Sequence, residues 1–438
     1  MNPEITKSPR EKMLYIAKYM PLLLQKLEED EHVMTCESVK IVMEKYHQIL
    51  LTAINVVPRV MFTQFEEDVF QSSPIHFRLI KNKGYWSFTH DNLRDDDKTQ
   101  SYKAHYRMKK ATFNQLIEIL DQHSAFDLKA HNSTPTYMQV AVVLWRFSNC
   151  HFGYRMMEAT LGFGQGSLFN FTERFLEAVN DQLGHLISWP STEDEFRKVK
   201  HGFEFPYPDD LSIKRLPNVI GAVDGKLIVI HRPKETSESY RDRKSNLSVN
   251  LTAVVTSECK FSYVYAGESG RCHDAHVFSE SDIAKEMLLN PERYFFEDAY
   301  ILGDSAYPLS YHVITPYSQL ESNLDPNKAR FNAKFSAMRQ VVERAFGILV
   351  KRWRFLWKYV YIQDQLRLVK IVNTSCILHN FCINANDTFG ITDEELVELS
   401  LASGSDRPAT FETNTPLERT AGGQRRDLLN VYVNTFLN

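Results

Sequence analysis

The spacing of apolar residues divides the chain into a helical first half and a strand-rich second half. Apolar positions recur at mixed intervals of three and four residues through most of residues 1–90 and again through residues 106–185, which is the period of an amphipathic helix. After Pro217 the pattern changes to short β-branched runs between polar loops: NVIGAV, KLIVIH, NLTAVVT, FSYVYAG and AYILGD. Helical patterns return over residues 332–351 and 364–383. This order predicts an α/β fold in which helices flank a mixed sheet.

The changes of pattern predict four parts along the chain. Residues 1–100 form a helical N-terminal extension that ends in the polar connector DNLRDDDKTQ. Residues 101–190 form a second helical region, and residues 215–383 contain the α/β domain. Residues 384–438 are a polar, acidic tail with one weak helix near RRDLLNVYV.

Within the second part, a glycine-bearing turn separates two predicted helices. The segment YRMMEATL is followed by the turn GFGQG, and the next helix begins near Ser167. These are the proportions of a helix-turn-helix motif, whose second helix reads DNA in the major groove. The charged residues of this second helix are Glu173, Arg174 and Glu177, so it is not basic. An ordinary helical hairpin therefore stays open as the alternative.

Composition excludes several classes of protein. With 43% hydrophobic and 24% charged residues, the chain is neither disordered nor fibrous. Its six cysteines are scattered, which favours a reducing compartment over a disulfide framework. No apolar run is long enough to predict a membrane span, and the N-terminus lacks the apolar core of a signal peptide. The net charge of −4 argues against nucleic-acid binding when the chain is taken as a whole.

The charge is unevenly distributed, and its distribution changes this picture. The acidic tail holds nine acidic and four basic residues, whereas residues 334–358 hold seven basic residues and a single acid, Glu343. Trp353 and Trp357 lie among these cations. Phosphate backbones bind such surfaces, and aromatic rings can stack on unpaired bases. The candidate DNA-contacting residues in this segment are Arg339, Lys351, Arg352 and Arg354.

Three carboxylates stand out by their context. Asp224 follows the predicted strand NVIGAV and Asp304 follows AYILG, so both lie where a strand gives way to a loop. Ligand sites of open α/β sheets cluster at such ends, although turn chemistry is the alternative for each residue alone. Glu343 borders the apolar stripe of a predicted helix, with Arg339 within roughly 40° of it around the axis. An i,i+4 pair between Arg339 and Glu343 on a solvated face is the alternative there.

Another group of potential ligands has a simpler explanation. Cys376, His379 and Cys382 are close in sequence but follow no common zinc spacing, and no fourth ligand is evident. They lie on an apolar helix pattern, so we interpret them as core residues. The sequence contains no P-loop, dinucleotide-binding glycine pattern or nucleophile elbow.

In several longer sequence blocks, residues from about 105 to 383 resemble the PIF/Harbinger superfamily of DDE transposases and the nucleases derived from them. The matching blocks occur in the family's order: YRMKKATFNQLIEIL, VAVVLWRFSNCHFGYRMMEATLGFGQGSLFNFTERF, IGAVDGKLIVI, YRDRKSNLSVNLTAVV, GRCHDAHVFSES, YILGDSAYPLSYHVITPY, FNAKFSAMRQVVERAFGILVKRWRFL and ILHNFC. The chain departs from the family at Lys226 and Leu227, where a Thr-His pair is common, and at Ser245, where Gly is usual. Residues 1–100 fall outside the resemblance.

The resemblance implies a fold and a chemistry. The fold would be RNase H-like, preceded by an all-helical region with a helix-turn-helix-like segment. Asp224, Asp304 and Glu343 would be the catalytic triad, in which Asp224 bridges two Mg²⁺ or Mn²⁺ ions while Asp304 and Glu343 bind one each. His273 and Asp274, in a matching block, are weaker candidates to support the site, and a buried His–Asp pair is their alternative.

Two functions of different class follow. The first is a metal-dependent DNA endonuclease or transposase-like protein that hydrolyses phosphodiester bonds, which the three acids favour. The second is a domesticated, catalytically silent DNA-binding or protein-interaction factor. The resemblance also implies a Myb-like DNA-binding partner protein and a nuclear location, although the chain has no clear nuclear localisation cluster, so a cytoplasmic location stays open. A homo-oligomer stays open as well, and no membrane association is expected.

Overall fold

The computed structural model describes residues 101–127, 134–149, 153–207, 210, 212–231, 240–242, 245–357, 360–362, 364–390, 392 and 416–437. These residues belong to one compact unit, Lys81–Asn438. The predicted N-terminal extension and residues 393–415 of the predicted tail lie outside the described residues. None of the helices in the described part is both long and apolar enough to cross a membrane.

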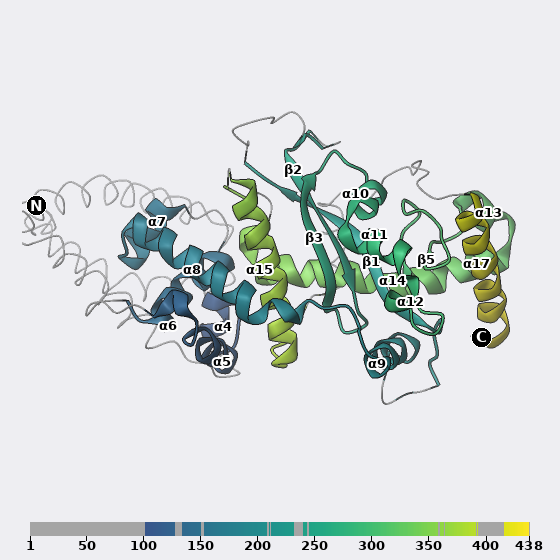
Figure 1. The fold of residues 1–438 in the computed structure, drawn as a ribbon, viewed down its shortest axis with the longest axis horizontal. Helices are drawn as coiled ribbons and strands as arrows, with labels where there is room; N and C mark the ends of the chain where they lie inside the picture. Colours follow the sequence, from purple (N-terminus) through teal and green to yellow (C-terminus); the bar gives the residue numbers. More distant parts are fainter. Residues whose placement is uncertain are drawn as a thin grey trace, which may run out of the picture. The chain divides into compact units, whose positions relative to one another are not determined.

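Helices precede the sheet, as the apolar spacing predicts (Figure 1). They are α4 Ser101–Tyr106, α5 Lys110–Leu120, α6 Thr136–Ser148, α7 Tyr154–Leu161, α8 Gln165–Leu183 and α9 Glu193–Glu204. The two helices predicted around the glycine turn are α7 and α8. Helix α7 ends at Gly162, whose φ of 75° is left-handed and favours glycine. DNA reading by α8 stays a prediction.

The sheet has five strands in the order β3-β2-β1-β4-β5. Their bounds are β1 Val219–Val229, β2 Ser248–Val255, β3 Phe261–Ser269, β4 Tyr300–Leu302 and β5 Val313–Ile314. Strand β2 runs antiparallel to both β1 and β3, whereas β4 runs parallel to β1 and β5. This mixed α/β arrangement fits the RNase H-like fold that the family resemblance implies.

The first strand is longer than the sequence pattern predicts. The pattern ends one strand at Asp224, but β1 continues unbroken to Val229 and Asp224 lies at its middle. The prediction is wrong because pairing overrides the turn preference of the Asp-Gly dipeptide. Every β1 residue from Ala222 to Val229 has a partner in β2, so the whole segment stays extended.

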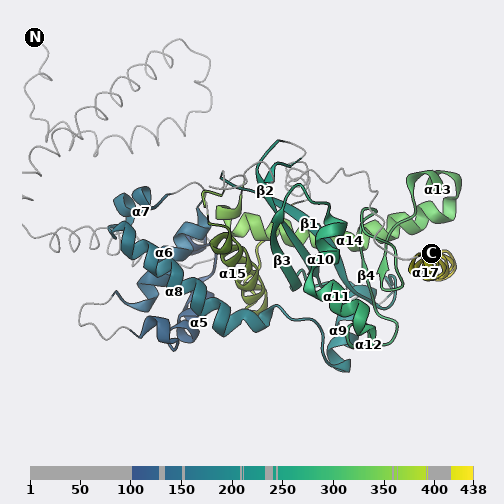
Figure 2. The same ribbon diagram turned by 45° about the horizontal axis from the view of Figure 1, so that its top comes forward.

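Helices cover both faces of the sheet (Figure 2). The long helix α14, Pro326–Arg352, and helix α15, Gln365–Asn384, pack against one face. The other face is covered by α9, by α10 Asp274–Glu280 and by α11 Asp282–Leu289, with α12 Pro291–Tyr294 next along the chain. Helix α14 begins earlier than its apolar pattern predicts because Asp325 caps it: its side chain accepts a hydrogen bond from the Asn327 amide at 2.9 Å.

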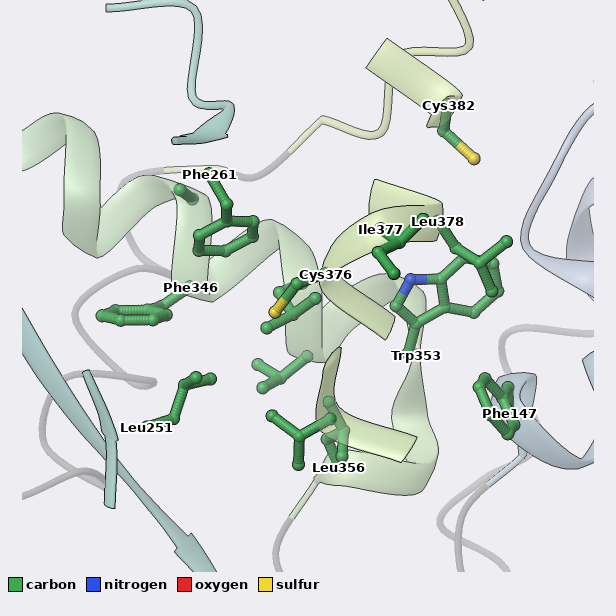
Figure 3. Packing of buried hydrophobic residues seen from close by; sticks show 14 of the residues in the cluster. Phe147, Leu251, Phe261, Phe346, Trp353, Leu356, Cys376, Ile377, Leu378 and Cys382 are labelled. Carbon is green, nitrogen blue, oxygen red and sulfur yellow. The ribbon is translucent and has the colours of Figure 1, made fainter. Parts of the chain in front are cut away.

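The main core joins the helical region to the sheet layer (Figure 3). Trp353, at the end of α14, is fully buried, and Phe147 of α6 packs edge-on against it with ring centroids 6.3 Å apart. The six side chains of the predicted apolar stripe are all buried: Phe335, Met338, Val342, Phe346, Leu349 and Trp353. Base stacking by Trp353 is therefore excluded.

The Cys–His group also lies in this core. Cys376, His379 and Cys382 of α15 are all 0% exposed, which confirms their interpretation as core residues. The Nε2 atom of His379 lies 2.8 Å from the carbonyl oxygen of Cys259, and burial lowers the pKa of this imidazole to about 4. His379 is therefore neutral at physiological pH.

The end of the acidic tail is part of the packed structure. Helix α17, Pro416–Phe436, packs against α14, and a short helix, α13 Gln319–Leu324, precedes α14. Arg425 of α17 is 8% exposed and donates hydrogen bonds to the carbonyl oxygens of Tyr311 and Asp298. The weak helix expected near RRDLLNVYV is thus 21 residues long and contributes buried contacts.

Candidate active site

Strand pairing brings Asp224 and Asp304 to the same edge of the sheet. In the parallel β1–β4 pair, Ala222 lies opposite Leu302, and each acid follows its strand partner by two residues. Because side chains alternate along a strand, Asp224 points to the same face as Ala222, which is the α14 face. Beyond Leu302 the chain turns: Asp304 accepts a hydrogen bond from the Ala306 amide at 2.8 Å. The turn chemistry considered for Asp304 is present, and it holds the carboxyl in the turn that follows β4.

Helix α14 supplies a carboxylate and a cation to this edge. The Nη1 atom of Arg339 lies 3.2 Å from Oδ2 of Asp224, and its Nη2 lies 2.8 Å from Oε1 of Glu343. The i,i+4 pair of Arg339 and Glu343 is therefore present, but it does not lie on a solvated face. The side chains of Asp224, Arg339 and Glu343 are 15%, 18% and 33% exposed. One guanidinium thus joins the acid of β1 to the acid of α14.

Burial and like charge shape the protonation of Asp224. Burial raises the pKa of Asp224 to about 7; Arg339 opposes this shift, whereas Asp304 and Asp274 add to it. Lys226 lies two residues further on the same face of β1, and burial lowers its pKa to about 8 although Asp224 favours its charged form. The site is therefore a partly enclosed group of opposite charges. Within it, Asp224 gains or loses its proton near neutral pH.

The weaker candidates His273 and Asp274 lie at the start of α10. His273 is the N-cap residue of that helix, and Asp274 is 4% exposed. Asn250 donates a hydrogen bond to Asp274 at 2.6 Å. A β-carbon added at Gly225 would lie 2.3 Å from an Asp274 carboxyl oxygen. Asp274 therefore packs against the backbone of β1 beside Asp224, on the opposite face of the strand.

The close approach of Asp274 predicts that Gly225 cannot be enlarged. Gly225→Ala should lower the free energy of unfolding by about 1–3 kcal/mol, the usual cost of overpacking, because Asp274 is held by buried Asn250. Gly423→Ala is the matched control: a β-carbon there meets nothing within 4 Å on helix α17, so this change should be neutral or stabilising. Thermal denaturation measures both, and equal melting temperatures would contradict the packing of Asp274 on β1.

Tyr307 lies near the acids but was not among the residues predicted from sequence. Its side chain is 3% exposed and packs edge-on against Phe278, and its hydroxyl has no hydrogen-bond partner in the described structure. Burial raises the pKa of Tyr307, and the carboxylates of Asp274, Asp224 and Asp304 raise it further. The only sequence signal is its position three residues after Asp304, which does not reveal that the ring lies among the acids.

Comparison with known proteins is consistent with this geometry. Residues 223–380 match the model of the family described as DDE superfamily endonuclease. The chain is 28% identical over 304 residues to the Arabidopsis thaliana protein named Protein ALP1-like, covering 66% of this chain and 72% of the relative. It is 25% identical over 308 residues to the Homo sapiens protein named Putative nuclease HARBI1, covering 70% and 83%. The family match and these relatives support the resemblance to the DDE/Harbinger superfamily. No solved structure matches it significantly.

The relatives support a nuclease- or transposase-like function for this Harbinger-type chain. A third relative, the Arabidopsis thaliana protein named Antagonist of like heterochromatin protein 1, is 26% identical over 307 residues, with 66% of this chain and 75% of the relative covered. The name of this relative refers to heterochromatin rather than to DNA cleavage. The matched family region begins at Val223 and contains all three predicted catalytic acids.

The remaining cationic candidates of the Harbinger-type chain differ in their exposure. Arg354 is exposed, and Lys351 is half-buried with its Nζ atom 2.8 Å from the Gly390 carbonyl oxygen. Arg352 is 1% exposed and donates a hydrogen bond to the Arg107 carbonyl oxygen at 2.7 Å. The prediction that Arg352 contacts DNA is therefore wrong. Its position among basic residues in the sequence does not reveal which side of the helix end faces the core.

The three predicted acids fit a divalent cation by their chemistry. Mg²⁺ and Mn²⁺ prefer carboxylate oxygens, and Asp224, Asp304 and Glu343 offer them at one edge of the sheet. The buried Tyr307 hydroxyl nearby has no hydrogen-bond partner in the described structure. In the described residues, however, no three His, Cys, Asp or Glu side chains form a ready metal-binding group. Arg339 lies between Asp224 and Glu343 instead.

Proposed function

We propose that this Harbinger-type chain is a divalent-metal-dependent DNA nuclease, related to transposases, whose acids are Asp224, Asp304 and Glu343. The observation that carries the proposal is their convergence. Asp224 and Asp304 each lie two residues beyond the paired Ala222 and Leu302, and Arg339 connects Asp224 to Glu343. Carboxylates from two adjacent strands and one helix are what a metal-dependent phosphodiesterase uses to hold its ions.

Each protein group has a role in the proposed reaction. Asp224, Asp304 and Glu343 would hold Mg²⁺ or Mn²⁺, which supplies an activated water and charge stabilisation for cleavage of the phosphodiester bond. Asp224 must lose its proton before it can act as a ligand. The turn at Ala306 holds Asp304 in place, and the β2 partners of β1 hold Asp224 extended. Of the four candidate DNA-contacting cations, Arg354 is the exposed one, and it would contact DNA phosphates.

A catalytically silent factor is the second candidate. It is favoured by the ion pairs of Arg339, which neutralise two of the three acids, and by Lys226, which lies on the same face as Asp224 where the family often has a Thr-His pair. Such a protein would bind DNA or a protein partner without cutting. A Myb-like DNA-binding partner, a nuclear location and assembly into a homo-oligomer are proposals under either function, and the acidic net charge supports a need for a DNA-binding partner.

A nicking assay tests the nuclease function. Wild-type protein with Mn²⁺ should convert supercoiled DNA to the nicked form, and Asp224→Ala should abolish this conversion because it removes the central carboxylate. Asp194→Ala is the control, since the Asp194 side chain is 92% exposed on α9 and should not affect nicking. If wild type and Asp224→Ala stay equally inactive on supercoiled, linear and single-stranded DNA, the silent factor is the correct function.

A further inference from the structure

The position of Arg339 is the feature that the nuclease function does not explain. Its guanidinium uses two nitrogens on two different carboxylates, with Nη1 at 3.2 Å from Asp224 and Nη2 at 2.8 Å from Glu343. Burial lowers the pKa of Arg339, but Asp224, Glu343 and Asp304 raise it by more, so the group stays charged. The cation is therefore held between two of the three acids of the proposed metal site.

The contacts of Arg339 and of a metal ion exclude each other. Oδ2 of Asp224 and Oε1 of Glu343 face the guanidinium, and these are oxygens that a bound ion would need at about 2.0–2.2 Å. A guanidinium nitrogen and a divalent cation cannot occupy the same side of one carboxylate oxygen, and their charges repel.

The two ion pairs of Arg339 differ in what holds them. Glu343 lies one turn away on the same helix, so its contact is local. Asp224 belongs to β1, so its contact depends on the packing of α14 against the sheet. Arg339 is 18% exposed, which leaves a path for its side chain toward solvent. A rotation of the Arg339 side chain would therefore break the Asp224 contact.

We propose that Arg339 is an internal counter-ion that occupies the metal-free site and is displaced from Asp224 when a divalent cation binds. The inference rests on the proposed nuclease function, because it requires that the acids bind metal. In the absence of metal the guanidinium offsets the repulsion among Asp224, Asp304 and Glu343. In its presence the ion takes over this role, and the arginine is released toward the open side of the site. The chain thereby limits metal loading until the metal concentration is sufficient to displace the side chain.

Metal binding by Arg339→Gln tests this inference. Mn²⁺ affinity of the full-length protein is measured by titration calorimetry and by the electron paramagnetic resonance signal of free Mn²⁺. Arg339→Gln should bind Mn²⁺ at least about five-fold more tightly than wild type, the lower end of ordinary coupling between two competing ligands. Arg344→Gln is the matched control: it removes the same charge from an exposed position on α14, so it reports the effect of losing one positive charge from this helix.

A stability measurement gives an independent readout. In EDTA, Arg339→Gln should melt below wild type because the acids lose their counter-ion, and saturating Mn²⁺ should close this gap. Arg339→Lys keeps the charge without the two-nitrogen fork, so its affinity should lie between wild type and Arg339→Gln even if the Gln variant folds poorly. Equal Mn²⁺ affinity of Arg339→Gln and Arg344→Gln would overturn the displacement while leaving the nuclease function intact. Failure of wild type and all variants to bind Mn²⁺ would overturn both.

Discussion

Asp304→Asn is expected to reduce Mn²⁺-dependent DNA nicking by more than about 100-fold while the fold stays intact. Loss of a side chain that only hydrogen-bonds to a metal ligand typically lowers metal affinity or activity by about 10–100-fold. Loss of the charge of a ligand itself should therefore lower activity further. Asparagine keeps the oxygen that accepts the Ala306 hydrogen bond, so the turn after β4 should be preserved. Initial nicking rates measure the effect, with circular dichroism and the melting temperature as checks on folding.

The other end of β4 offers a matched control. Asp298 lies two residues before the strand, as Asp304 lies two residues after it, and Asp298 is exposed. It accepts a hydrogen bond from the Tyr311 hydroxyl at 3.0 Å, which asparagine can also accept. Asp298→Asn should therefore nick DNA at the wild-type rate. Comparable nicking by Asp298→Asn and Asp304→Asn would remove Asp304 from the proposed triad.

The sequence predicts the composition of this site better than its contacts. Helical spacing alone places Arg339 beside Glu343, because residues four apart lie on one face of a helix. The contact of Arg339 with Asp224 is not predictable in this way, since it depends on how α14 crosses β1. Local patterns therefore identify pairs within one element, whereas pairs between elements require the packed structure.

The sequence predictions that are wrong also failed because they concern packing between elements. The Asp-Gly dipeptide predicts a turn at Asp224, yet β2 pairs with β1 on both sides of it and keeps the strand extended. Tyr307 has no local signal because the three acids that raise its pKa, Asp274, Asp224 and Asp304, come from separate segments of the chain. Arg352 and Arg354, near the end of α14, carry the same positive charge, but Arg352 faces the core whereas Arg354 faces solvent. Which side a residue faces at a helix end is set by the neighbouring elements.

Arg352 lies at a buried junction between the helical region and the end of α15. It donates hydrogen bonds to the carbonyl oxygens of Arg107 and Asp387, and its Nη1 lies 3.6 Å from the Asp387 carboxylate. Asp387 is 0% exposed and also binds the Lys109 amide at 2.6 Å and the Lys103 ammonium at 3.1 Å. The junction thus connects α4, α5 and α14 to the segment that follows α15.

Arg352→Met is accordingly expected to lower the free energy of unfolding by about 3–5 kcal/mol, the usual cost of removing one partner from a buried ion pair. Methionine fills similar space but leaves two carbonyl oxygens without donors and removes one cation from Asp387. Lys351→Met is the control, because Lys351 is half-buried, its hydrogen bond to Gly390 is exposed and its Nζ atom lies 5.8 Å from the centroid of the Phe389 ring, so the change should cost about 1 kcal/mol or less, the value of one exposed hydrogen bond. Chemical denaturation measures both changes. If Arg352 instead contacted DNA, Arg352→Met would leave the stability unchanged and weaken the salt dependence of DNA binding, and this pair of results would contradict its structural role.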